Sequence, residues 1–372
     1  GCSGALIDAA QALGARQAEF CARHGIRVHG LLPDRDGSEG ICHAIVTEHY
    51  ALPGQIVAGT DSHTPHAGAL GCLAFGIGAS DMASAWRTGD VRLTVPQTCR
   101  VMLHGRLGPG VAAKDLVLHL LRLPYVRDGG AVGQAIEYDG EAIAAMNTDE
   151  RATLTNMAAE IGGFTGIVAP DAETVRFVRE RRGGEAICEP WLASDTNATF
   201  AHTIDVDCSA VRPMIARPGD PGLGVEIEAL DEAVSIDVAY CGSCTGAKRE
   251  DLERVHEVLE WGVAHGLRVP RQIRFYVQFG SLDVRDHCAA RGMLETFLDA
   301  GAELIEPGCG ACVNAGPGAS QSPDEVTVSA QNRNFPGRSG PGQVWLASPA
   351  TVAASALAGR LMSFAALARE RS

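Results

Sequence analysis

Residues 235–264 read SIDVAYCGSCTGAKREDLERVHEVLEWGVA: a short apolar run, a turn rich in glycine and cysteine, and a longer amphipathic stretch. The run 235–240 has the length and the apolar content of a buried strand. The segment 248–264 carries an apolar stripe at helical spacing, formed by Leu252, Val255, Val258 and Leu259. This stretch therefore predicts a strand, a tight turn and a helix, the repeating unit of a parallel sheet.

The same alternation continues on both sides of this stretch. Downstream it predicts strands at 273–278, 303–305, 325–330 and 343–347 and helices at 283–299 and 349–361. Upstream it predicts strands at 55–60, 99–105 and 166–169 and helices at 112–122 and 148–161. We expect an α/β fold of three α/β domains with largely parallel sheets, packed as one body and divided at about 1–98, 99–218 and 219–372.

Composition argues against several classes of protein. The 372 residues carry a formal net charge of −14 and no long run of Lys or Arg, so no nucleic-acid partner is expected. No stretch approaches the roughly 18 apolar residues of a membrane helix, and no signal peptide is visible, so we expect a cytoplasmic protein without a membrane partner. In a reducing compartment, the 12 cysteines favour metal ligands and buried thiols over disulfides.

Chemically active side chains follow several predicted strands at the point where each strand ends. They are Asp61 and His63, Cys241 and Cys244, Cys309 and Cys312, and Asn332 and Arg333. Ligands of open α/β sheets bind at the carboxyl ends of the strands. The sequence therefore predicts one site to which all these segments contribute.

Two Cys-x-x-Cys pairs, Cys241-Gly-Ser-Cys244 and Cys309-Gly-Ala-Cys312, are candidates for metal binding. Thiolates bind zinc or iron–sulfur clusters, and the neighbouring glycines let backbone amides approach the sulfurs. Zinc ribbons usually separate their pairs by about 15–20 residues, whereas a complete βαβαβ run lies between these two. Buried thiols without a ligand and a thioredoxin-like redox pair are further alternatives, and spacing alone favours a cluster only modestly.

Histidines and an arginine loop extend the candidate site. His43 and His63 have carboxylates as plausible partners, namely Asp61 and the Glu160 that shares a helix face with Asn156. A paired carboxylate fixes the tautomer of a histidine and raises its pKa, which suits acid–base chemistry. In the loop 331–338, Arg333 and Arg338 could hold a polyanionic substrate through bidentate contacts, although such a loop could equally be a surface turn.

Together these segments resemble the aconitase superfamily, and within it most closely the large subunits of 3-isopropylmalate dehydratases. The resemblance spans roughly residues 15–365 and occurs in the family's order. It rests on GTDSHTPHAGALGCLAFGIGASDM, TNMAAEIGG, YCGSCTGAKREDL, GCGACVNAGPG, SAQNRNFPGRSG and the closing SPATVAASALAG. Several long motifs in register are far more specific than a bare Cys-x-x-Cys.

The resemblance implies a [4Fe–4S] cluster, one per chain, at the centre of the three domains. Its protein ligands would be Cys244, Cys309 and Cys312, with Cys241 as a neighbour and one iron left open to substrate. The resemblance further implies catalytic pairs of His43 with Asp61 and of His63 with Glu160. Residues near the cluster or substrate would be Ser62, Asn156, Asn332, Arg333 and Arg338.

Three departures from the family pattern bear on activity. The family's N-terminal Asp-His pair has no counterpart here, and its Ser-Cys-Thr-Asn motif reads Ser243-Cys244-Thr245-Gly246. The swivelling domain with the family's serine base is also missing, so we expect a small subunit to supply it and the chain to be inactive alone.

The function implied by the resemblance is the dehydration and rehydration of a small hydroxy-di- or tricarboxylic acid, with 3-isopropylmalate and 2-isopropylmalate of leucine biosynthesis as the leading pair. Homoaconitase, aconitase and substituted-malate dehydratase activities are alternatives. An RNA-binding regulator without a cluster and a zinc-stabilised binding protein are alternatives of other classes, and the acidic charge disfavours the first of them.

Overall fold

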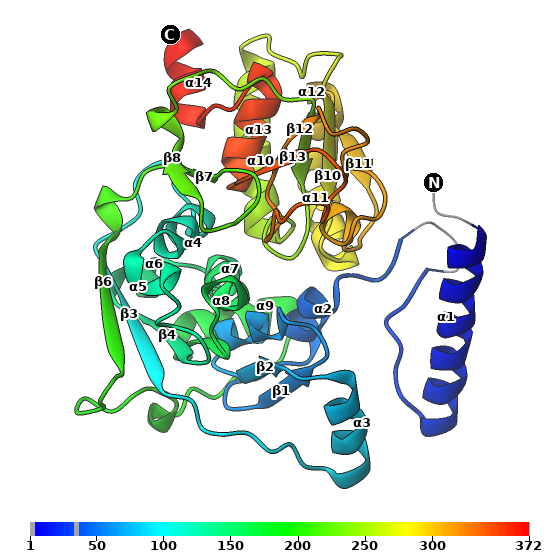
Figure 1. Cartoon of the computed structure of the whole chain (residues 1–372), viewed down its shortest axis with the longest axis vertical. Coiled ribbons are helices and arrows are strands. Elements are labelled where there is room, and N and C mark those ends of the chain that lie inside the picture. The colour runs from blue at the N-terminus through cyan, green and yellow to red at the C-terminus, as the bar shows by residue number, and fades with distance from the viewer. Residues whose placement is uncertain (1–3, 33–36, 372) are drawn as a thin grey trace.

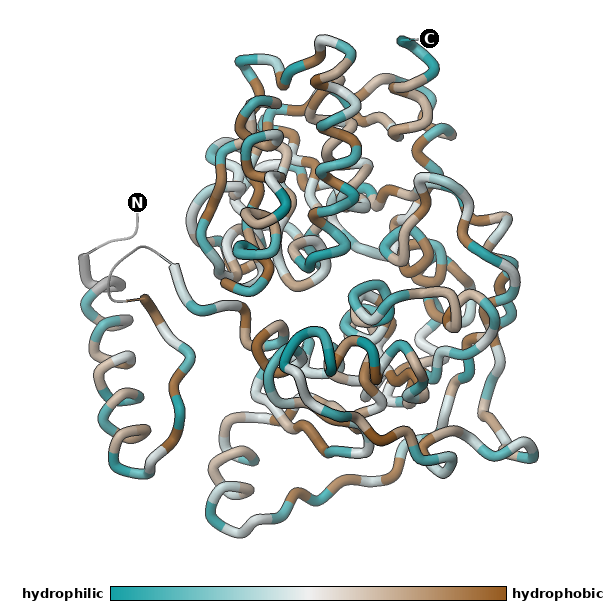
Figure 2. Tube along the Cα trace, turned by 180° about the vertical axis from the view of Figure 1, so that it is seen from behind, coloured by the Kyte–Doolittle hydropathy of each residue, from teal (hydrophilic) through white to brown (hydrophobic). Residues whose placement is uncertain are grey.

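The computed structural model describes residues 4–32 and 37–371, which form three sheets with their covering helices (Figure 1). The chain begins with the helix α1 (Gly4–His24), which stands apart from the main body and mixes apolar with polar residues (Figure 2). Within the described residues, none of the helices is long and apolar enough to span a membrane.

The largest sheet has seven strands in the order β11-β10-β9-β12-β13-β7-β8. Five strands run parallel: β9 (Val238–Cys241), β10 (Arg274–Gln278), β11 (Glu303–Ile305), β12 (Val326–Ser329) and β13 (Gln343–Ala347). The short β7 (Met214–Ala216) and β8 (Gly224–Glu226) complete one edge in antiparallel pairing. The predicted division at residue 218 therefore falls between two strands of this sheet.

The helices of this sheet match the predicted alternation. They are α10 (Arg249–Ala264), α11 (Leu282–Ala290), α12 (Met293–Ala300), α13 (Pro349–Ala358) and α14 (Phe364–Arg371). Helix α10 packs against α12 and α13, and its predicted apolar stripe is buried. Where one helix was predicted over 283–299, the chain forms two, because Gly292 takes a left-handed φ of 71° between α11 and α12.

The second sheet is parallel and ordered β5-β4-β3-β6. Its strands are β3 (Thr98–His104), β4 (Ala135–Asp139), β5 (Thr165–Val168) and β6 (His202–Asp207). Its helices are α4 (Ala113–Leu121), α5 (Pro124–Arg127), α6 (Glu141–Ala145), α7 (Thr148–Asn156), α8 (Ala158–Ile161) and α9 (Ala172–Arg182). The helix predicted at 148–161 is thus divided between α7 and α8 at Met157.

The third sheet has only β1 (Ile56–Gly59) and β2 (Leu73–Gly76), paired in parallel. The 3-10 helix η1 (Thr64–Leu70) joins them and packs on α7 and β5. Helices α2 (Cys42–His49) and α3 (Ala79–Thr88) flank this unit. The remaining short 3-10 helices are η2 (Pro190–Leu192), η3 (Cys208–Ala210), η4 (Ile227–Ala229) and η5 (Gly310–Val313).

Strand register brings the cysteine turn and the asparagine–arginine loop together. Val238 of β9 pairs with Arg274 of β10 on one side and with Thr327 of β12 on the other. Because all three strands are parallel, the segments that leave β9 and β12 emerge at the same edge. The Cys244 turn and the loop that begins at Gln331 therefore lie side by side.

Candidate active site

Cys244 lies at the junction of two asparagine side chains from different parts of the chain. Nδ2 of Asn156, at the end of α7, donates to its Sγ at 3.2 Å, and Nδ2 of Asn332 donates at 3.4 Å. Burial raises the pKa of the Cys244 thiol, but the positive charges of His63 and His43 and the two amides outweigh burial and leave the pKa lowered. The surroundings of Cys244 therefore favour a thiolate, the form that binds metals.

The backbone before Cys244 is held in an uncommon conformation. Ser243 has a φ of 66°, the left-handed region that L-residues rarely adopt. Its side chain is buried, and its Oγ donates to Asn332 Oδ1 at 2.9 Å. This bond links the turn after β9 to the loop after β12.

Cys309 and Cys312 bracket the start of η5, which faces the same edge of the sheet. Burial raises the pKa of Cys309 to about 12, with further contributions from negative charge on Cys244, Cys42 and Cys312. As a whole residue Cys309 is exposed although its thiol is largely desolvated, whereas Cys312 is buried and has Nη2 of Arg338 3.7 Å from its Sγ. The thiols of these separate loops are thus electrostatic neighbours.

The glycine inside the second cysteine pair is required by a close contact. Gly310 has a φ of 53°, and a Cβ there would lie 1.9 Å from Gln278 Oε1 and 2.5 Å from the Tyr240 hydroxyl. Gln278 and Tyr240 are hydrogen-bonded to each other, so neither is free to retreat. The loop of Cys309 and Cys312 therefore packs directly on the ends of β9 and β10.

The spacing of the three predicted ligands suits a cluster better than a single zinc ion. Zn–S bonds of about 2.3 Å in a tetrahedral site place sulfurs within about 4 Å of one another. Among the described residues, Cys244, Cys309 and Cys312 do not form a group whose ligand atoms all lie within 4.8 Å. All three thiols are free of disulfide bonds, and their spacing excludes a single zinc ion bound by all of them.

Two histidine–carboxylate pairs lie beside Cys244. Nε2 of His43, on α2, donates to Asp61 Oδ1 at 3.0 Å, and Nε2 of His63 donates to Glu160 Oε1 at 2.9 Å. Nδ1 of His63 is 3.4 Å from the same Asp61 oxygen. Both pairs are those expected from the sequence.

Both histidines are held in the protonated form. Burial lowers the pKa of His43, but the hydrogen bonds to Asp61 and Cys42 and the negative charges of Cys244 and Cys42 together outweigh it and raise the pKa to about 10. Burial likewise lowers the pKa of His63, which the charge of Glu160 and the bond to Asp61 raise to about 10. The hydrogen bonds from His43 and His63 hold the pKa of Asp61 well below its usual range. The site thus presents two imidazolium groups that can donate protons.

Arg333 joins the second pair to the turn after β1. Its Nε donates to Glu160, and its Nη2 donates to Ser62 Oγ at 3.0 Å. The second oxygen of Glu160, Oε2, is buried without a hydrogen-bond partner among the described residues. Ser62 and Arg333 are therefore linked to Glu160, and Asn156 and Asn332 to Cys244, whereas Arg338 reaches the site through Cys312.

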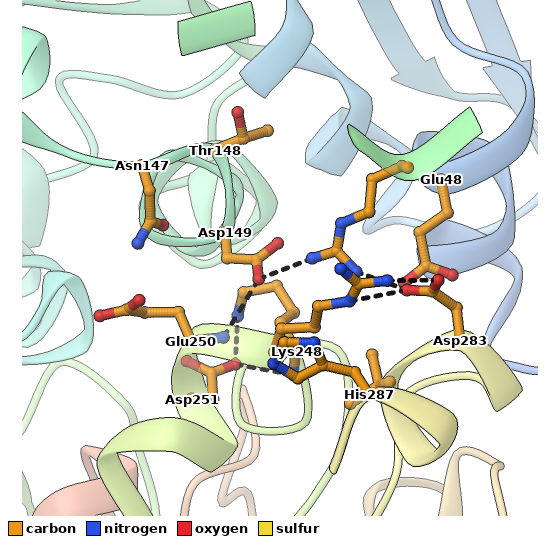
Figure 3. Close-up of polar contacts among 12 residues, drawn as sticks. Glu48, Asn147, Thr148, Asp149, Lys248, Glu250, Asp251, Asp283 and His287 are labelled. Atoms are coloured by element: carbon orange, nitrogen blue, oxygen red, sulfur yellow. Dashed lines mark hydrogen bonds and ion pairs between the residues drawn. The ribbon is translucent and has the colours of Figure 1, made fainter. Parts of the chain in front are cut away.

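Three further residues at the site escaped the sequence analysis. His66 is buried and its Nδ1 accepts from Asn156 Nδ2 at 3.1 Å, while burial holds its pKa well below the usual value. Lys114 and Lys248 are buried next to the Cys244 turn. Figure 3 shows Lys248 beside Asp251 at the start of α10, on the side where Asp149 of α7 lies. His66 could have been noticed from its place three residues after His63, whereas neither lysine occurs in a recognisable pattern.

Cavities border both histidine pairs. One of about 350 Å³ is lined by Glu160 and Arg333 together with Arg127, Ala159 and Phe335. Another of about 190 Å³ is lined by residues that include Cys42, His43 and Asp61. The first cavity therefore offers arginine side chains beside Glu160, and the second offers His43 and Asp61.

Comparison with known proteins defines the class. The aconitase family (aconitate hydratase) matches residues 9–359, so the chain belongs to the aconitase family. A solved structure, the holo form of aconitase X from Thermococcus kodakaraensis, aligns over 84% of this chain and 68% of that chain at 13% identity with a TM-score of 0.48, too distant a likeness for a residue assignment.

Its similar relatives within the family are large subunits. The 3-isopropylmalate dehydratase large subunit 1 of Methanopyrus kandleri is 38% identical over 91% of this chain and 79% of that protein. The 3-isopropylmalate dehydratase large subunit of Aquifex aeolicus is 35% identical over 96% of this chain and 81% of that protein. The probable methanogen homoaconitase large subunit of Methanothermobacter thermautotrophicus is 35% identical over 94% and 80%.

Proposed function

We propose that this chain is the cluster-bearing large subunit of a hydro-lyase that moves a hydroxyl group between adjacent carbons of a small hydroxy acid, with 3-isopropylmalate and 2-isopropylmalate as the leading pair. The observation that supports this most directly is the convergence of Cys244 with the two histidine–carboxylate pairs and Arg333. Two of the three similar relatives described above are 3-isopropylmalate dehydratase large subunits, which is why this pair is the first to test.

In this proposal Cys244, Cys309 and Cys312 hold a [4Fe–4S] cluster. With three protein ligands, one iron stays open and would act as a Lewis acid on the hydroxyl and carboxylate of the substrate. The amides of Asn156 and Asn332 stabilise the Cys244 thiolate by hydrogen bonding. Cys241 has no part in ligation, because its buried Sγ faces Pro349 O in the core.

The remaining residues would bind the acid and move protons. Dehydration breaks a C–O bond and a neighbouring C–H bond, so it needs a proton donor for the departing hydroxide and a base for the carbon proton. His43, kept protonated by Asp61, is the donor in our proposal. Arg333 and Arg338 would bind substrate carboxylates, while Ser62 and the pair of His63 with Glu160 orient Arg333.

The base for the carbon proton would come from a small subunit that carries the swivelling domain. The relatives are themselves named large subunits, which supports a partner of this kind. We propose a cytoplasmic setting, because a reducing compartment keeps exposed thiols such as Cys42 and Cys309 free.

A second candidate substrate class is homocitrate and homoaconitate. The identity to the probable homoaconitase large subunit is 35%, close to the 38% and 35% of the dehydratase subunits. Identity at this level does not separate the two substrates, so activity toward both acids should be measured.

Anaerobic reconstitution of the full chain tests the proposal. We expect about four irons and four sulfides per chain, and with the co-encoded small subunit a turnover of 3-isopropylmalate that exceeds that of homocitrate. Cys309→Ser should abolish the cluster, whereas the control Cys188→Ser, outside the site, should retain it. One zinc ion per chain, or a normal cluster in Cys309→Ser, would refute the ligand assignment.

A further inference from the structure

Lysine is rare in this chain, and both lysines lie at the site. Of the 31 basic residues, 29 are arginine and only Lys114 and Lys248 are lysine. Lys114 is 1% and Lys248 6% exposed. Since the chain uses arginine everywhere else, a lysine at these two positions indicates a need for a compact ammonium group rather than a planar guanidinium.

Lys114 bridges the two loops that carry Cys244 and Asn332. Its Nζ donates to the backbone oxygens of Gln331 at 2.6 Å and Ala330 at 3.4 Å, and to Thr245 Oγ1 at 3.3 Å. Thr245 Oγ1 in turn donates to the Ala330 oxygen at 2.9 Å. One ammonium group therefore holds the residue after Cys244 and the residue before Asn332 in a fixed relation.

The position of Lys114 is unfavourable for a charge by itself. It is the second residue of α4, where the helix macrodipole disfavours a cation. Its three partners are uncharged oxygens, and none of the ion pairs in the described part of the chain includes it. Lys248, by contrast, is paired with Asp251. A buried charge without a partner is strongly destabilising, so a negative group must offset Lys114 in the working protein.

The nearest candidates for that negative group belong to the site. Burial lowers the pKa of Lys114 to about 8, while the negative charges of Glu160 and Cys244 act in the opposite direction. Glu160 is already neutralised by His63 and Arg333. Asp251, which also raises the pKa of Lys114, is neutralised by Lys248. The negative charge that is left to balance Lys114 is therefore that of Cys244 and of the group that Cys244 binds.

We propose that Lys114 is a positioning residue of the cluster site, which sets the Cys244 turn against the Asn332 loop and supplies the buried positive charge that balances the cluster-bound thiolates. The inference rests on the proposed function, because it requires a cluster on Cys244. It accounts for a buried lysine that touches no substrate-facing group in the chain. Gly246 stands where the family has asparagine, and a side chain there would collide with Ala330, whose Cβ would lie 2.4 Å from the added Cβ. Lys114 therefore anchors the turn in place of that asparagine.

Lys114→Met tests the role of the charge, because methionine fills similar space without it. The cluster-free variant should unfold at the same temperature as the cluster-free parent or higher, since a buried charge is removed. The loaded variant should lose its cluster to a chelator more readily, with cluster affinity about 10–100-fold lower. Its reduction potential should shift to more negative values, because the cation that favours the reduced, more negative cluster is gone.

In this role Lys114→Met weakens cluster binding but does not destabilise the cluster-free chain. A simple packing role would instead lower the stability of both the cluster-free and the cluster-loaded chain. Equal loss of stability in both forms, or unchanged cluster affinity and potential, would overturn the inference. If Lys114→Met does not fold, Thr245→Val decides: it removes the hydroxyl partner at similar volume and should also speed cluster loss, and no change would overturn the inference. A parent chain that binds no cluster would instead refute the proposed function.

Discussion

Arg333 joins two segments of the site through one guanidinium group, which donates to Glu160 and to Ser62. A lysine keeps the charge but cannot serve both partners in the same geometry. We expect Arg333→Lys to keep a normal cluster content and lower kcat/KM about 10–100-fold, the equivalent of a charge-assisted hydrogen bond of ~1.5–3 kcal/mol.

Steady-state kinetics with the small subunit, together with iron analysis, checks this prediction. Arg360→Lys is a suitable control, because Arg360 pairs with Glu370 at the surface, away from the site. Unchanged kinetics in Arg333→Lys would show that this arginine does not contact the substrate.

Ser243 combines a strained backbone with a useful hydrogen bond. Its φ of 66° suits glycine, whereas its Oγ holds Asn332. Ser243→Ala keeps the strain and loses the bond, and Ser243→Gly loses the bond but relieves the strain. We therefore expect the glycine variant to be more stable than the alanine variant by about 1 kcal/mol. Chemical denaturation of the cluster-free chains measures the difference, and the reverse order would contradict the strain argument.

Single residues differ in how far sequence alone reveals them. Asp61, His63 and Glu160 occur in long motifs, and the resemblance to a known family added His43, so both expected pairs agree with the hydrogen bonds observed. Lys114 was not found, since a lysine in the first turn of an amphipathic helix is ordinarily exposed. Only the packing of α4 against the loops after β9 and β12 makes it a buried residue of the site.

Among the elements, η1 depends on one glycine. A Cβ on Gly68 would lie 1.8 Å from the backbone oxygen of Gly166, which is the second residue of β5. Because backbone cannot move aside as a side chain can, we expect Gly68→Ala to destabilise the chain by about 3 kcal/mol. Gly108→Ala, with open space around it, should change stability by less than about 0.5 kcal/mol. Thermal unfolding of both variants checks the contrast, and equal stability would show that η1 can shift.

Several elements were predicted to within a residue, whereas others were missed. The strands at 303–305 and 343–347 and the helix at 248–264 lie within a residue of their expected bounds. β2, β7 and β8 have three or four residues each and too few apolar side chains to show a period. Their pairing depends on neighbours distant in sequence, such as Leu346 with Ala216.

At the scale of the molecule, a polar network connects parts of all three predicted domains. Arg181 of α9 pairs with Asp149 of α7 and with Asp283 of α11, and Glu48 of α2 lies beside Asp283 (Figure 3). The division into 1–98, 99–218 and 219–372 stays a prediction, but contacts of this kind agree with domains that pack as one body.

Glu48 should make stability depend on pH. Burial, and then Asp283, raises its pKa from 4.5 to about 8, so the folded chain keeps a proton that the unfolded chain releases. The contribution of this group to stability is therefore full below about pH 4.5 and is lost as the pH rises through 8. Glu48→Gln should leave the unfolding temperature nearly unchanged at pH 4.5 and raise it at pH 8, where it removes about 1–3 kcal/mol of destabilisation.

Thermal unfolding at the two pH values measures this effect, with the exposed Glu260→Gln as control. A stabilisation of equal size at both pH values would mean that the proton on Glu48 is not responsible.

The bond between Ser62 and Arg333 joins residues 271 positions apart. A nascent chain on the ribosome consequently cannot present the complete set of contacts until Arg333 has been translated. Iron and sulfide delivered earlier would meet only isolated thiols. Assembly of the proposed cluster would therefore follow the synthesis of all the loops that converge on the site.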